Sequence, residues 1–165
     1  MPWDTSATRQ RIREVRRRLE ALLDGMDYCL DWRPGPNEWS AREVVYHLLT
    51  TPPEGLGAAL REVVEGGRTE LTLPWGQPGL RPQDREKDLP DVLADVRAFF
   101  ASLEELLEQH PPERLETARF TAHLPVRNRS EERSVAAHLE RQLSSHWPEH
   151  LEQLAQVREA LGVET

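Results

Sequence analysis

The chain has 165 residues, of which 30% are charged and 38% hydrophobic, a balance typical of one domain whose core folds without cross-links. Its 21 basic and 29 acidic side chains give a net charge of −8, which argues against nucleic acid as the main partner. No apolar run approaches the roughly 18 residues of a membrane span, no signal peptide is visible and Cys29 is the single cysteine, so we expect one cytoplasmic domain spanning residues 1–165.

The first predicted helix runs from about residue 5 to residue 30. Apolar residues recur at steps of three and four from Ile12 to Leu30 and form one stripe. The segment RQRIREVRRR, residues 9–18, contains six arginines and one glutamate. We interpret it mainly as a solvated helix face, with contact to an anionic partner as the alternative.

The second predicted helix begins at Ser40. Ser40 and Glu43 form an S-x-x-E capping box, in which each side chain satisfies a free backbone N–H of the other residue. Pro52 and Pro53 interrupt the apolar pattern, which then resumes up to residue 64. We therefore expect a kinked or two-piece helix that ends at residues 66–67.

Two irregular connections separate the remaining helices. Residues 67–88 are rich in proline and glycine, and a connection of this length is often functional or crosses the fold. The third helix is expected over residues 90–109, a second irregular connection over 113–130, and the fourth helix from about Ser130 to just before Gly162. Four amphipathic helices without convincing strands predict an all-α four-helix bundle, and the long connections argue against a simple up-down-up-down order.

The fourth predicted helix carries two histidines that are four residues apart. His146 and His150 follow the same three-four rhythm as the leucines around them, so both point into the bundle. Pro148 lies between them and cannot donate a hydrogen bond to Ser144. We expect the helix to kink or bulge there and to continue with both histidines near one face. The alternative is a new helix that begins near Trp147, with Pro148 in its first turn.

His47 occupies the apolar face of the second helix in the same way. A lone histidine in such a position is usually a hydrogen-bonded core residue. Three of them inside one bundle, His47, His146 and His150, favour a metal site built from facing helices. Three imidazole ligands leave one coordination position open, which is typical of a reactive site.

Other residues are weaker candidates for the same chemistry. His138 is a reserve ligand because it is turned away from the shared face. HWPEH also matches the H-x-x-E-H pattern of inverted zincins, in which Glu149 would be a general base. Glu43 could accept a proton, although its capping role is the commoner one, and nothing nearby in sequence activates Cys29. Three aromatic residues could line the pocket or simply pack in the core: Trp39, Tyr46 and Trp147.

Two segments resemble a known family. RPGPNEWSAREVVYHLL, residues 33–49, and HWPEHLEQL, residues 146–154, are similar to the opening and closing motifs of the DinB/YfiT-like superfamily. The resemblance implies a four-helix bundle with a long crossover between helices 2 and 3. It also implies a divalent metal, zinc or nickel, on His47, His146 and His150, a homodimer and a small-molecule substrate.

Some members of that superfamily are thiol S-transferases that use bacillithiol or mycothiol, and others resemble maleylpyruvate isomerases that use a thiol cofactor. The first hypothesis is therefore a metal-dependent transferase in which a low-molecular-weight thiol is the nucleophile. The second is a non-catalytic, dimeric, stress-linked binding module. The third is a metal-assisted hydrolase in which water attacks the substrate.

Overall fold

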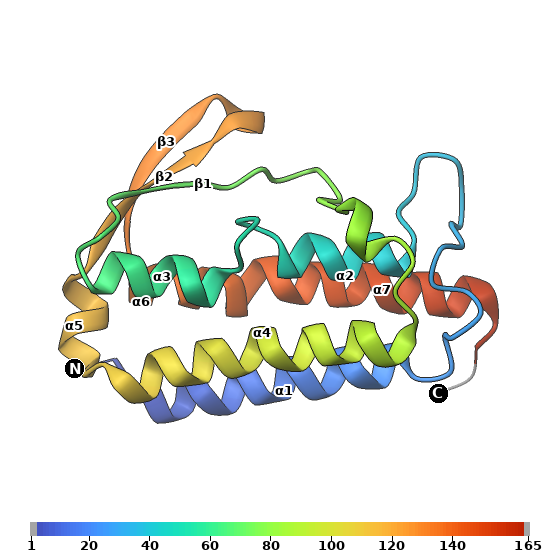
Figure 1. Cartoon of the computed structure of the whole chain (residues 1–165), viewed down its shortest axis with the longest axis horizontal. Coiled ribbons are helices and arrows are strands. Elements are labelled where there is room, and N and C mark those ends of the chain that lie inside the picture. Colours follow the sequence, from blue (N-terminus) through green and yellow to red (C-terminus); the bar gives the residue numbers. More distant parts are fainter. Residues whose placement is uncertain (1–2, 164–165) are drawn as a thin grey trace.

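The computed structural model describes residues 3–163, and helices dominate it (Figure 1). The helices are α1 (Thr5–Leu23), α2 (Ala41–Leu49), α3 (Leu56–Val64), α4 (Leu89–Gln109), α5 (Pro112–Thr117), α6 (Val135–Arg141) and α7 (Trp147–Leu161). The π-helical segment η3 (Gln142–His146) joins α6 to α7, and two short 3-10 turns are η1 (Pro82–Asp84) and η2 (Pro125–Arg127). The strands are β1 (Glu70–Thr72), β2 (Arg119–Leu124) and β3 (Arg129–Ser134).

Four helical bodies form the bundle: α1, α2 with α3, α4, and α6 with α7 (Figure 1). α1 packs against α4 and α7, and α2 packs against the same two helices. The α2–α3 pair and α4 run in the same direction, because residues 65–88 return along the length of the bundle before α4 begins (Figure 1). Apolar side chains from all four bodies form one continuous core.

The first helix is shorter than predicted. α1 ends at Leu23, and Gly25 follows in the left-handed region at a φ of +77°, where glycine avoids the steric penalty of a Cβ atom. Met26 and Leu30 are nevertheless buried, with 0% and 3% of their surface exposed. The apolar spacing therefore continued past the helix end, because the turns that follow also direct these side chains into the core.

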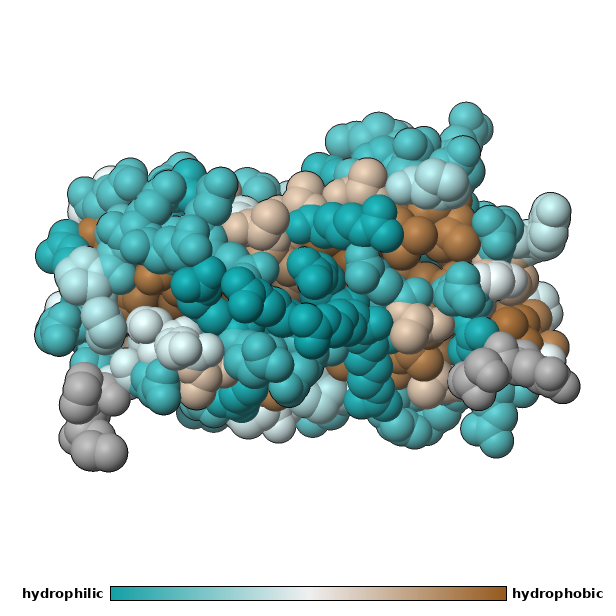
Figure 2. Space-filling model, turned by 90° about the horizontal axis from the view of Figure 1, so that it is seen from below, coloured by the Kyte–Doolittle hydropathy of each residue, from teal (hydrophilic) through white to brown (hydrophobic). Residues whose placement is uncertain are grey.

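The basic segment of α1 takes part in an ion-pair layer between helices. Four of its arginines pair with glutamates of α4, α6 and α7: Arg9–Glu108, Arg13–Glu104, Arg11–Glu140 and Arg18–Glu152. α1 lies along the underside of the bundle, and Figure 2, which views that side, shows a largely hydrophilic surface with hydrophobic atoms in separate patches. Within residues 3–163, every helix is too short or too polar to cross a lipid bilayer.

The second helix is in two pieces, which is one of the two forms that the sequence predicted. Ser40 caps α2, since its Oγ accepts from the N–H of Glu43 at 3.2 Å and the Glu43 carboxylate accepts from the N–H of Ser40 at 3.2 Å. Residues 50–55, with a cis Thr51–Pro52 bond, then separate α2 from α3. The capping box thus sets the start of the helix that carries His47.

The structure is mostly helical, as predicted, but the two connections also contribute a small sheet that the all-α prediction did not include. β1 pairs in parallel with β2, and β2 pairs antiparallel with β3. In β2, Phe120, Ala122 and Leu124 are buried and alternate with more exposed residues, which is the period of a strand with one covered face. Residues 129–134 form β3, although the fourth helix was expected from about Ser130, and that helix begins after Ser134.

Candidate metal centre

The fourth helical body passes through η3 just before the two histidines. In this segment the N–H of Trp147 donates to the carbonyl of Gln142, five residues earlier, instead of to the usual fourth. Pro148 then lies in the first turn of α7, where its missing N–H has no consequence. The bulge therefore lies in the turn before Pro148, and α7 begins at Trp147 as in the alternative prediction, while the chain stays helical through His146 and His150.

The structure brings the three predicted imidazoles together from α2, η3 and α7. Their ring centres are 4.5 to 5.2 Å apart, and the rings meet edge to face. One ring nitrogen from each of His47, His146 and His150 lies within 4.8 Å of the others. The Nε2 atoms of His47 and His146 are 3.1 Å apart. Two nitrogens that bind one ion at 2.0–2.1 Å in tetrahedral geometry are about 3.3 Å apart, so this spacing suits a shared cation.

An oxygen atom lies within hydrogen-bonding distance of the Nδ1 atom of each imidazole. The Nδ1 atom of His47 donates to the backbone carbonyl of Gln77 at 2.7 Å. The Nδ1 atoms of His146 and His150 lie 2.6 and 2.8 Å from the side-chain oxygens of Gln142 and Gln153. An oxygen acceptor at Nδ1 places the ring proton there and leaves the lone pair on Nε2 for a metal.

Burial keeps these rings neutral. His47 is 1% exposed, and burial followed by the nearby His150 lowers its pKa to about 4. Burial, with His150 and His47 close by, lowers the pKa of His146 to about 3. Burial also lowers the pKa of His150, against the opposing hydrogen bond to Gln153. Neutral imidazole is the form that binds metal, so the donor set fits a divalent cation near neutral pH.

The imidazoles open onto a cavity of about 240 Å³. Its other lining residues come from the long connection, from η2, and from α6, η3 and α7: Trp75, Gly76, Arg127, Arg141, Ser145 and Glu149. Glu149, the weak general-base candidate of the H-x-x-E-H pattern, is exposed and lines the same cavity as the histidines. Trp75, Arg127 and Arg141 were missed, although a tryptophan within a long Pro- and Gly-rich connection was a signal worth following.

Two tryptophans pack against the histidine rings. Trp39 stacks parallel to His150 with 6.0 Å between ring centres, and Trp75 stacks on His146 at 5.5 Å. The other aromatic candidates belong to the core. The hydroxyl of Tyr46 donates to Asp95 at 2.6 Å, and Trp147 is 1% exposed among phenylalanines.

His138 is not one of the grouped histidines but contacts Gln142, which in turn contacts His146. It is 1% exposed, its Nε2 is 3.3 Å from the Gln142 amide nitrogen, and its Nδ1 is 3.0 Å from a guanidinium nitrogen of Arg133. Burial, followed by the charge of Arg133, lowers the pKa of His138 to about 3. The reserve ligand is thus a neutral neighbour of the glutamine that contacts His146.

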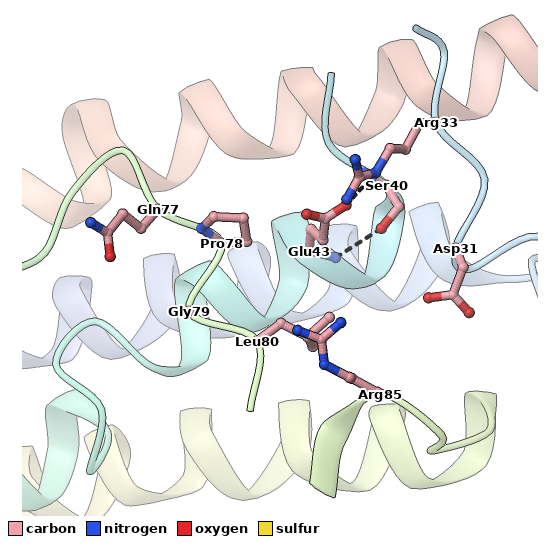
Figure 3. A pocket seen from close by; sticks show the side chains of 9 residues that line it. All are labelled: Asp31, Arg33, Ser40, Glu43, Gln77, Pro78, Gly79, Leu80 and Arg85. Atoms are coloured by element: carbon pink, nitrogen blue, oxygen red, sulfur yellow. Dashed lines mark hydrogen bonds and ion pairs between the residues drawn. The ribbon is translucent and has the colours of Figure 1, made fainter. Parts of the chain in front are cut away.

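Glu43 borders a different cavity, of about 460 Å³, which the loop residues Gln77 to Leu80 also line (Figure 3). Its carboxylate points toward Arg33, which donates to it at 2.8 Å, and also accepts from the backbone of Ser40. These bonds give Glu43 a structural position at the start of α2. Burial raises the pKa of the Cys29 thiol, so that residue is no activated nucleophile.

Comparisons with known proteins agree on the fold. A family model for the DinB superfamily matches residues 11–153. Among solved structures, YfiT from Bacillus subtilis is similar with a TM-score of 0.72 and 16% sequence identity, over 97% of this chain and 89% of that chain. YfiT is described as "a probable metal-dependent hydrolase with an unusual four-helix bundle topology". No protein with a curated description matched the sequence.

Proposed function

This chain belongs to the DinB superfamily, and from that premise we propose that His47, His146 and His150 bind one divalent cation, zinc or nickel, at a catalytic centre for a small molecule. The observation that carries the proposal is the orientation of the rings. Every Nδ1 has an oxygen partner, and the three imidazoles face one another within 4.8 Å. Histidines that served only as core residues would not require three rings oriented in this way.

Hydrolysis is the reaction that the surroundings support best. A bound cation would lower the pKa of a coordinated water or thiol and polarise the substrate. Glu149 lines the same cavity, and its carboxylate would take the proton from water as the water oxygen attacks a carbonyl or phosphoryl centre. The leaving group would then receive that proton. The description of YfiT as a probable hydrolase supports the same reading.

Thiol transfer is the second candidate. Arg127 and Arg141 line the cavity, and cationic neighbours favour the thiolate form of a low-molecular-weight thiol. In that reaction the thiolate sulfur would form a bond to an electrophilic carbon of the substrate, while the bond from that carbon to its leaving group breaks and the leaving group departs with the electron pair. The two reactions differ in whether water or a thiol is consumed.

Metal content tests the proposal directly. Tag-free protein is expected to contain close to one zinc or nickel ion per chain after purification. His146→Ala is expected to lose at least nine-tenths of that metal, because the loss of one ligand lowers the affinity about tenfold or more. His110→Ala is the matched control, because that ring bonds to the carbonyl of Leu106, outside the cavity. Equal metal in all three proteins, or none in any, contradicts the proposal and leaves the non-catalytic binding module.

Substrate screening separates the two reactions. Ester, amide and phosphoester substrates are supplied with and without bacillithiol or mycothiol, before and after chelation. Cleavage without thiol that chelation abolishes supports hydrolysis, and Glu149→Gln is expected to slow it about 100-fold. Turnover that requires both the thiol and the metal supports transfer. The homodimer implied by the family stays a prediction, and sedimentation equilibrium measures it.

A further inference from the structure

Two arginines at the mouth of the histidine cavity have few charged partners. Arg127 is exposed and, among residues 3–163, forms no ion pair with a carboxylate. Arg141 has one long ion pair, at 3.6 Å, to Glu131. That carboxylate is already held by Arg133 at 2.5 Å and lies 3.6 Å from Arg129. Both arginines that line the cavity therefore have most of their hydrogen-bonding capacity available.

Trp75 joins the two arginines to the histidine centre. Its ring stacks on His146, and the guanidinium of Arg127 lies 5.2 Å from the ring centre. The indole N–H of Trp75 is shut off from solvent and finds no acceptor within the described part of the chain. Because its ring contacts both His146 and Arg127, the indole signal of Trp75 should report on a ligand bound beside either residue.

The charge of the cavity points to an anion. Glu149 is the one carboxylate among its lining residues, against Arg127 and Arg141, and the chain as a whole has a net charge of −8. A positive site on an acidic protein attracts negatively charged ligands, whereas the rest of the surface repels them. The volume of about 240 Å³ lies below the roughly 300–1,000 Å³ of common ligand sites, which favours a small molecule.

We propose that Trp75, Arg127 and Arg141 form an anion-binding subsite beside the histidine centre, and that the substrate is a small molecule with a carboxylate or phosphate group. The inference rests on the proposed function, because it places the reacting group of that substrate next to the three imidazoles. Guanidinium groups bind both kinds of anion through paired N–H donors, and the ring of Trp75 forms part of the wall of the subsite.

The indole signals of the five tryptophans provide the test. Nitrogen-15-labelled protein, freed of metal and then of chelator, is titrated separately with inorganic phosphate and with acetate, and the Trp75 signal is assigned with Trp75→Phe. We expect that signal to shift saturably. Arg127→Gln and Arg141→Gln should each weaken binding at least about tenfold, because each removes a charge-assisted contact.

Arg129→Gln is the matched control, since it removes the same charge from the same hairpin but from a residue that does not line the cavity. It should bind both anions like the unaltered protein. A Trp75 signal that neither anion moves, or affinities that Arg127→Gln leaves unchanged, would overturn the subsite. The anion that binds more tightly identifies the group on the substrate.

This experiment is independent of the metal. Arg127→Gln is expected to keep its full zinc or nickel content. Loss of anion binding alone in the arginine variants, with normal metal content, supports the subsite as a separate element. If the unaltered protein binds no metal, the proposed metal centre is wrong, but the phosphate titration still tests the subsite.

Discussion

At the scale of single residues, hydrogen-bond partners explain how this chain presents its histidines. Gln77, Gln142 and Gln153 each offer an oxygen to one Nδ1 atom. Two of these are side chains on the same helical body as the histidines they contact, and the third is a backbone carbonyl from the long connection. The partners differ in origin, but each has the same effect on the ring, because each favours a lone pair on Nε2.

The glutamine behind His150 gives a direct prediction. Gln153→Leu removes the acceptor at 2.8 Å while keeping the size of the side chain, so the ring loses its fixed orientation. We expect metal affinity to fall about 10- to 100-fold, the usual effect of losing such a partner. Calorimetric titration with zinc measures it. Gln156→Leu, an exposed position one turn away, is the control, and equal affinities in the two variants would contradict the role of Gln153.

His138 makes stability depend on pH. Its pKa is about 3 in the folded protein against 6.5 for an ordinary histidine, so the unfolded chain binds a proton that the folded chain does not. The resulting stability is present above about pH 6.5 and decreases as the pH falls below it, by about 2 kcal/mol at about pH 5. Urea unfolding of metal-free protein at about pH 7.5 and 5 measures the loss. His138→Gln should lose about 2 kcal/mol less over that interval, and an identical loss would refute the assignment.

At the scale of elements, the connection between α3 and α4 is the part that completes the site. It contributes the carbonyl of Gln77 to His47 and the ring of Trp75 to His146. Gly79 fixes its path: its φ is +65°, and a Cβ atom there would lie 2.5 Å from the Oγ1 of Thr50 in the segment after α2. The loop can approach α2 closely only because this residue has no side chain.

Gly79→Ala is therefore expected to disturb both the fold and the metal centre. The left-handed backbone costs about 1–2 kcal/mol for alanine, and the contact with Thr50 adds about 1–3 kcal/mol. Gly66→Ala is a matched control, because its φ is +83° but nothing lies within 4 Å of the added Cβ atom. Urea unfolding and zinc titration of both variants separate the effects. If Gly79→Ala matches Gly66→Ala in both measurements, the close approach of the loop has no bearing on the site.

At the scale of the whole molecule, the three histidines connect two bodies of the bundle that are about 100 residues apart in sequence. His47 belongs to α2, and His150 belongs to α7, which packs against it. A cation shared between them would bind the folded chain only, because the unfolded chain does not hold these rings together. Metal binding should then appear as added stability of the entire bundle.

Thermal unfolding measures that stabilisation. With free zinc at 100 times its dissociation constant, the stability gain is about 2.7 kcal/mol, which raises the midpoint by about 5–10 °C for a domain of this size. Chelation should reverse the rise. His150→Ala should show no rise, and a variant that responds to zinc as the unaltered protein does would mean that the ion binds elsewhere.

Local patterns determined much of this molecule. The capping box at Ser40, the three-four spacing of leucines and the break at Pro52 are read within a few residues, because a helix is set by neighbours along the chain. The grouping of His47, His146 and His150 followed from the same spacing, since each lies on the apolar face of its helix. Gly25, which ends α1 early, was also a local signal, and it was overlooked.

Only the tertiary structure decided what surrounds those histidines. The strands are too short for their sequence pattern to stand out, so β2 was predicted as an irregular connection and most of β3 as the start of a helix, and their pairing joins residues of separate segments. Trp75 and Arg127 lie in irregular segments that have no period, so no spacing in the sequence indicates where their side chains point. The sequence by itself determined which faces the helices bury, whereas long-range packing decided which loop residues reach the imidazoles, because loop positions depend on contacts far away in the chain.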